Sequence, residues 1–125
     1  MRELNDHKVN PANDLLTVTA EDAPGSGGAN HVYRIVYPDA QPGGPTMAPT
    51  DLFFQNGPIN EVGVNGLTHE ALLAILCDRL RGFQAGPYHS ADNAEALACM
   101  EQAQIALQRR TKARMARGVE GTHTV

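Results

Sequence analysis

Two helical patterns separated by a single break occupy the second half of the chain, and they limit the fold more than any other feature of the sequence. In the first pattern, apolar side chains recur at i, i+3, i+7 and i+10, namely Leu73, Leu76, Leu80 and Phe83. This spacing places them on one face and predicts an amphipathic helix over 69–84. Thr68 is a suitable N-cap for this helix, and Ala85-Gly86-Pro87 ends the pattern.

The second helical pattern is longer than the first. It begins near Ser90, where Ser90 or Asp92 can cap the free N–H groups of the first turn. It continues to about Arg117, where Gly118 supplies a C-terminal stop. At 1.5 Å per residue this helix is about 40 Å long. Its C-terminal end therefore extends past the first helix and needs another surface, which an adjacent subunit would provide.

The N-terminal half of the chain predicts short strands joined by loops rich in Pro and Gly. Residues 1–12 are polar and are expected to be irregular. Alternating or β-branched segments predict strands at 15–20, 31–37, 52–55 and 59–64. The expected fold class is therefore α+β, with a small N-terminal antiparallel sheet followed by a C-terminal antiparallel two-helix hairpin. We expect one domain over 1–125, with a β segment at 1–66 and the hairpin and tail at 67–125.

Charge and cysteine usage narrow the class of protein. The chain has 125 residues and a net charge of −4, whereas proteins that bind a nucleic-acid polymer usually have a basic surface. Cys77 and Cys99 lie in the two helical patterns without a CxxC spacing, so we expect buried thiols in a reducing compartment; a disulfide between the helices is the alternative. No apolar run reaches signal-peptide or membrane length, so we expect a soluble intracellular protein.

A cationic cluster lies at the end of the second helical pattern. Half of the ten Lys and Arg residues fall within it: Arg109, Arg110, Lys112, Arg114 and Arg117. Arg110, Arg114 and Arg117 share one helical face and can make bidentate contacts with phosphate oxygens. The alternative is a solvated helix end whose cations oppose the dipole. Thr111 lies beside this face and can donate its hydroxyl to a ligand or to a helix carbonyl.

Two further candidates flank the break between the helices. Phe83 can stack on a nucleobase, or it can close the core of the hairpin. Asn93 can recognise a polar edge of a ligand, or it can cap the second helix. Both residues lie near the bend of an antiparallel hairpin, whereas Arg110 and Arg114 lie at its far end. One subunit cannot easily bring the two groups together, but a partner packed antiparallel can, and this geometry predicts a homodimer with two shared pockets.

Signatures of catalysis are missing from the sequence. It contains no HExxH, GxSxG, Walker or GxGxxG motif, and its five histidines lack the spacing of metal ligands. We therefore predict no catalytic residues, no metal and no cofactor. An enzyme such as a phosphodiesterase remains an alternative, as does a small protein that binds nucleic acid or has a structural role.

The second half of the chain resembles a known helical hairpin. Residues 78–87 read DRLxxFQxGP and residues 110–122 read RTxxRxxRGVEGT. In combination these segments look like the hairpin shared by two bacteriophage immune-evasion families, the Thoeris anti-defence sponges and the anti-CBASS cyclic-nucleotide sponges. The β segment, which ends in FQNGPINEVGVNG at 54–66, resembles the longer Thoeris type.

The resemblance implies a protein that sequesters immune second messengers without cleaving them. Its ligands would be cyclic ADP-ribose isomers and cyclic di- and trinucleotides, bound in the cytoplasm of the host bacterium. The base-stacking aromatic of the family falls on Phe83, its hairpin Asn on Asn93, and its phosphate-binding arginines on Arg110 and Arg114. The resemblance further implies homodimers that assemble to a hexamer, with pockets between subunits, and no contact with a nucleic-acid polymer or a membrane.

Overall fold

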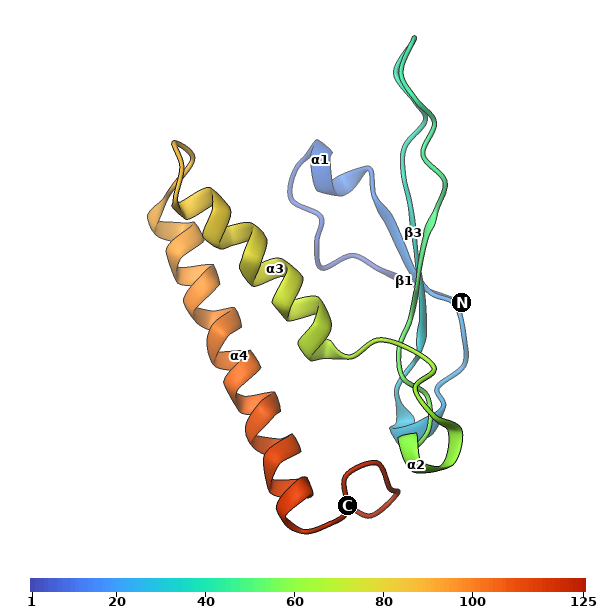
Figure 1. Ribbon diagram of the computed structural model, residues 1–125. Helices are drawn as coiled ribbons and strands as arrows, with labels where there is room; N and C mark the ends of the chain where they lie inside the picture. The colour runs from blue at the N-terminus through green and yellow to red at the C-terminus, as the bar shows by residue number, and fades with distance from the viewer. The chain divides into compact units, whose positions relative to one another are not determined.

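The computed structural model describes residues 1–125 and has a sheet followed by helices, which confirms the predicted α+β class (Figure 1). The strands are β1 (Arg2–Leu4), β2 (Thr17–Ala20), β3 (Val32–Val36) and β4 (Thr50–Phe53). The helices are α1 (Pro11–Asp14), the 3-10 turn η1 (Ser26–Gly28), α2 (Ile59–Val62), α3 (His69–Gln84) and α4 (Ala91–Ala116). The chain divides into two compact units, a sheet unit (1–57 and 64–66) and a hairpin unit (58–63 and 67–125). None of the helices is both long enough and apolar enough to cross a membrane.

The sheet is antiparallel throughout, with the strands in the order β1-β2-β3-β4. Three of the predicted strands are present, shortened or displaced by one or two residues at their ends. Cross-strand pairs fix the register of β3 against β4. Arg34 lies opposite Asp51, and its Nε donates to that carboxylate at 2.7 Å. The Tyr33 ring meets the Phe54 ring edge-on, with centroids 5.6 Å apart, so aromatic packing supports the same register.

Residues Arg2–Leu4 form the strand β1 of the sheet, so the prediction that residues 1–12 are irregular was wrong for these three residues. Arg2, Glu3 and Leu4 pair with the outer edge of β2. Three residues are too few to show the alternation that identifies a strand in a sequence, and only the presence of β2 beside them makes the ladder. The short helix α1 also falls in this segment, with Asn10 as its N-cap and Pro11 in the first turn.

The strand predicted at 59–64 was also wrong, because residues Ile59–Val62 form the helix α2. Its Ile and Val favour a strand by propensity. Pro58 immediately before it and Gly63 immediately after it, with a φ of 74° at Gly63, confine the segment to one helical turn. The bracketing residues therefore decide the structure of this short segment against the preference of its side chains.

The loop between β2 and β3 is held by one carboxylate. Asp22 accepts hydrogen bonds from the backbone N–H groups of His31 and Val32 and from the side chain of Asn30. Burial raises the pKa of the Asp22 carboxyl, but these hydrogen bonds outweigh burial and keep the pKa below its ordinary value of 3.8. Asp22 therefore fixes the start of β3 as an ionised group.

The hairpin unit follows the predicted helices closely. Helix α3 has the predicted bounds, and the Thr68 hydroxyl accepts from the N–H of Ala71 at 3.1 Å. Helix α4 is capped by Ser90 and ends where predicted. At that end Gly118 has a φ of 72°, its N–H donates to the carbonyl of Met115, and the N–H of Val119 donates to the carbonyl of Arg114. These two bonds form a Schellman motif, which satisfies carbonyls that a helix end otherwise leaves free.

Packing between α3 and α4 leaves much apolar surface uncovered. Cys77 is buried as predicted, but Cys99 is exposed, which corrects the expectation of two buried thiols; both are free. Cys99 shares a face of α4 with Glu95, Gln102 and Ala103, which are all exposed. Ile75 is 64% exposed, Ile105 47% and Met115 62%. The apolar stripe of this hairpin is therefore only partly buried within one chain.

Candidate ligand-binding site

Phe83 lies in the last turn of α3, next to the bend, and is half-buried. The guanidinium carbon of Arg79, one turn earlier on the same helix, lies 4.9 Å from the centre of the Phe83 ring. A cation over an aromatic face is attracted by the electron density of the ring. Arg79 therefore covers one face of the Phe83 ring and limits where a base could stack. The sequence pattern did not indicate this contact, although Arg79 belongs to the DRLxxFQxGP segment.

Asn93 lies across the bend, in the first turn of α4. Ser90 is the residue that caps this helix, because its hydroxyl accepts from the backbone N–H of Asn93 at 3.0 Å. The side-chain amide of Asn93 forms no hydrogen bond within the chain. Capping by its side chain therefore does not account for Asn93.

Arg110 and Thr111 lie near the other end of α4. Arg110 is exposed and forms no hydrogen bond or ion pair. Thr111 is half-buried, and its hydroxyl does not bond to a helix carbonyl, which was the alternative role considered for it. A guanidinium and a hydroxyl without partners in the chain are therefore adjacent at this end of the helix.

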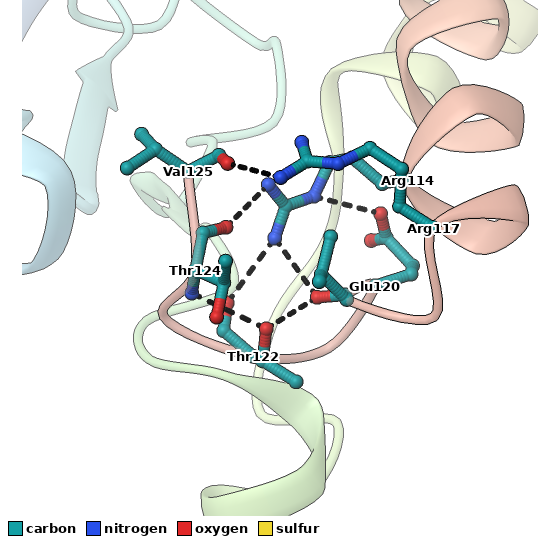
Figure 2. Close-up of polar contacts among 7 residues, drawn as sticks. Arg114, Arg117, Glu120, Thr122, Thr124 and Val125 are labelled. Atoms are coloured by element: carbon teal, nitrogen blue, oxygen red, sulfur yellow. Dashed lines mark hydrogen bonds and ion pairs between the residues drawn. The ribbon is translucent and has the colours of Figure 1, made fainter.

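Arg114 has a different environment from the one that its spacing suggests. It is 9% exposed, so the alternative of a solvated helix end is wrong for this residue. The chain after α4 folds back over it (Figure 2). Its guanidinium donates to the Glu120 carboxylate at 3.1 Å and to three carbonyls, of Val119 at 3.0 Å, Thr122 at 3.3 Å and Thr124 at 2.6 Å. Arg114 is therefore bound by its own chain.

Residues 118–125, called the tail from here on, form a small folded segment around that guanidinium. The N–H of Thr122 donates to the carbonyl of Val119 at 3.1 Å and closes a turn in which Gly121 has a φ of 80°. The tail also contacts α2, through the N–H of Asn60 to the carbonyl of Gly121 at 3.1 Å and through His123 to Glu61 at 3.2 Å. The RGVEGT segment contained the signal for this structure, since Gly at 118 and at 121 permits two tight turns.

The predicted residues fall into two separate groups within one chain. Phe83 and Asn93 flank the bend, whereas Arg110, Thr111 and Arg114 lie near the C-terminal end of α4. Seventeen residues separate Asn93 from Arg110, a distance of about 26 Å along the helix axis. A single hairpin therefore does not join the aromatic ring to the free cation.

A shallow groove of about 400 Å³ runs between the two helices, away from both groups. It is lined by Ala74, Cys77, Asp78, Arg81, Glu101, Gln104 and Ile105. Arg81 and Glu101 form an ion pair across it at 3.1 Å, and Gln104 donates to the carbonyl of Glu70 at 3.0 Å. These contacts join α3 to α4, so we interpret the groove as a feature of the packing between the two helices. No group of three or more His, Cys, Asp and Glu side chains is placed to hold a metal ion.

Comparison with known proteins bears on the same part of the chain. The chain is 44% identical over 70 residues to a protein named Thoeris anti-defense 1 from Bacillus phage SBSphiJ7. That alignment covers 56% of this chain and 49% of the relative, so the chain spans about half the length of the curated relative it matches. A family model described as "Acb2/Tad1, hairpin domain" matches residues 50–112, which include β4, α2, α3, the bend and most of α4. Since this match covers half of the chain, the chain belongs to the Acb2/Tad1 hairpin family.

Proposed function

We propose that this chain is a phage anti-defence protein that binds immune second messengers of the host bacterium and holds them without cleaving them. The ligands are cyclic ADP-ribose isomers and cyclic di- and trinucleotides, taken up in the host cytoplasm. Membership of the family and the name of the Bacillus phage relative support the anti-defence role.

The observation that carries the proposal is that polar groups at both ends of α4 form no hydrogen bond or ion pair within the chain. A cyclic messenger presents phosphates and one or two bases, so it requires cations, amide donors and an aromatic platform. Arg110 and Thr111 have no partner in the chain, and neither does the Asn93 amide. Phe83 supplies a half-buried ring beside Asn93. These are binding groups, and no pair of a nucleophile and a base stands with them.

The proposed site is shared between two copies of the chain. The ring and the free cation are too far apart in one hairpin, but an antiparallel neighbour would bring the Phe83 end of one copy to the Arg110 end of the other. The exposed apolar side chains Ile75, Ile105 and Met115 support such a neighbour, since a second hairpin would cover them. We propose a homodimer on these grounds, and a hexamer of dimers from the family resemblance.

A release experiment tests the sponge mechanism. The purified protein is incubated in excess with a cyclic ADP-ribose isomer, and the mixture is then heated to denature the protein. We expect the supernatant to contain ligand of unchanged mass that activates a messenger-dependent effector again. Hydrolysed or linearised ligand would instead favour the phosphodiesterase alternative.

The second candidate function, a small phage protein that binds nucleic acid, rests on the cationic cluster at 109–117. The net charge of −4 weighs against it, because proteins that bind the polymer usually present an extended basic surface. Binding of long DNA with a steep dependence on salt would favour this candidate over the sponge.

A further inference from the structure

Two asparagines in the segment after β4 are each followed by glycine, at Asn56-Gly57 and Asn65-Gly66. An asparagine in such a pair can lose its side-chain amide spontaneously, because the backbone nitrogen of the next residue attacks the side-chain carbonyl carbon. Glycine favours this reaction, since it has no Cβ to shield its nitrogen and its backbone rotates freely. Whether either pair reacts in the folded chain depends on the contacts of its side chain and its backbone.

The side-chain amide of Asn65 is bonded through both its oxygen and its nitrogen. The oxygen accepts from the N–H of Asn56 at 2.8 Å, and the nitrogen donates to the carbonyl of Asn56 at 2.7 Å. The backbone N–H of Asn65 also donates to the Gln55 side chain at 3.0 Å. The Asn65 side chain therefore has to break both bonds to Asn56 before it can turn toward the nitrogen of Gly66.

The backbone of Gly66 is confined as well. A Cβ on this residue would lie 2.6 Å from the N of Gln55 and 2.6 Å from the carbonyl oxygen of Phe53, so the main chain at Gly66 passes directly against the end of β4. Ring closure needs the backbone at 65–66 to rotate, and a closely packed neighbour resists that rotation. Asn65 is therefore protected by its contacts, although the residue is exposed.

Asn56 lacks both kinds of protection. Its backbone groups are bonded to Asn65, but its side-chain amide forms no hydrogen bond, and the residue is exposed. The N–H of Gly57 has no acceptor, so the attacking nitrogen is also free. Gly57 has a φ of 94°, which glycine adopts far more readily than other residues. The turn therefore requires the residue that makes Asn56 reactive.

We propose that Asn56 is a site of spontaneous deamidation in the folded chain, that Asn65 is protected, and that the product opens the pairing between them. The Gly57 nitrogen bonds to the side-chain carbonyl carbon of Asn56, the bond from that carbon to the amide nitrogen breaks, and ammonia leaves with the proton from Gly57. Water then opens the succinimide ring at one of its two carbonyls, giving aspartate or isoaspartate. The reaction consumes water, releases ammonia and involves no oxidation.

The isoaspartate product changes the group that Asn65 recognises. In isoaspartate the backbone runs through the former side chain, which inserts a methylene between the N–H and the carbonyl of residue 56. The Asn65 amide bonds to those two groups at the spacing of an ordinary residue, so it no longer matches both of them. The reaction needs no messenger, and its test is therefore independent of the proposed function.

Ageing of the purified full-length chain in mildly alkaline buffer tests the site. Cleavage after Glu61 places the two asparagines on separate peptides, and mass spectrometry measures the deamidation of each in the folded protein and in urea. In urea we expect similar rates, because glycine follows both. In the folded protein we expect Asn65 to react about tenfold more slowly than Asn56, since two hydrogen bonds must open first. A rate at Asn65 equal to or above that at Asn56, or an Asn56 that reacts only in urea, would overturn the proposal.

Hydrogen exchange follows the pairing itself. We expect the protection of the amides of residues 56 and 65 to fall in the aged wild type as isoaspartate accumulates. Asn56→Gln removes the reactive side chain and keeps the paired backbone groups, so ageing should leave its protection unchanged. Fresh Asn56→Asp carries the charge of the product without the added methylene and should also keep it. Unchanged protection in the aged wild type, or an equal loss in fresh Asn56→Asp, would overturn the opening of the pairing by isoaspartate.

Discussion

Gln84 and Ser90 join the two ends of the hairpin bend through a reciprocal pair of hydrogen bonds. The Gln84 side chain donates to the carbonyl of Ser90 at 3.0 Å and accepts from the N–H of Ser90 at 3.0 Å. The side-chain amide thus pairs with a backbone amide as a neighbouring strand would. Since Phe83 precedes Gln84 and Asn93 lies in the turn that Ser90 caps, this pair fixes the spacing of both candidate ligand contacts.

Replacing Gln84 by Ala should therefore destabilise the bend. Two hydrogen bonds are lost at an exposed site, for an expected loss of about 1–2 kcal/mol in the free energy of unfolding. Gln84→Glu keeps the acceptor, loses the donor and sets a carboxylate against the carbonyl of Ser90, so it should not restore stability. Urea denaturation of the three proteins checks this, and full stability in Gln84→Glu would show that the donor contributes nothing.

Two glycines offer a matched pair of substitutions to Ala with opposite expected effects. A Cβ on Gly66 would lie 2.4 Å from the carbonyl carbon of Phe54 and 2.6 Å from the N of Gln55. The backbone cannot move away from such a contact without a large cost, so Gly66→Ala should destabilise the protein by about 1–3 kcal/mol or more. A Cβ on Gly82, within α3, meets nothing within 4 Å, and Gly82→Ala should stabilise by about 0.5–1 kcal/mol. Thermal unfolding of both variants tests the pair, and similar shifts in Tm would contradict it.

Phe83→Ala separates the two roles considered for that ring. A base platform predicts a loss of about 1–3 kcal/mol in messenger affinity with little change in Tm. A core role predicts a large drop in Tm instead. Arg79→Met keeps much of the bulk over the ring but removes the cation–π contact. We expect a smaller loss of affinity from Arg79→Met than from Phe83→Ala, measured by calorimetry on folded samples.

Arg110→Ala should weaken messenger binding and leave the fold intact. The side chain is exposed and has no partner, so its removal breaks nothing within the chain. Loss of charge-assisted hydrogen bonds to phosphate should weaken affinity by about tenfold to a hundredfold. Arg109→Ala, the adjacent exposed cation, serves as the control for loss of charge alone. Equal affinity in the wild type and Arg110→Ala would remove Arg110 from the site.

Acid should weaken the sheet unit through Asp22. The pKa of this carboxyl is lowered in the folded chain, so its contribution to stability is fully present above the unfolded value of 3.8 and is lost as the pH falls through the lower folded value. Asp22→Asn lacks that dependence. Wild type should therefore be more stable than Asp22→Asn at neutral pH, and the difference should shrink below 3.8. Denaturant midpoints across the pH series test this, and a constant difference would contradict it.

The sequence by itself determined the hairpin. The caps at Thr68 and Ser90, the break at 85–87 and the stop at Gly118 are local signals, and the helices begin and end at them. Local signals suffice there because capping and helical periodicity depend on residues within a few positions of one another. The strand at 31–37 was predictable for the same reason, being long and rich in β-branched and aromatic residues.

Tertiary structure decided the rest. Strand β1 exists because β2 lies beside it, and α2 is a helix because Pro58 and Gly63 leave room for one turn. The clearest case is Arg114, which shares a helical face with Arg110 but is buried by the tail, whereas Arg110 remains free. Periodicity fixes the direction in which a side chain leaves its helix. The residues that the side chain contacts depend on the course of the chain after the helix ends. Here that course is set by the turns at Gly118 and Gly121 and by the backbone hydrogen bonds that close them.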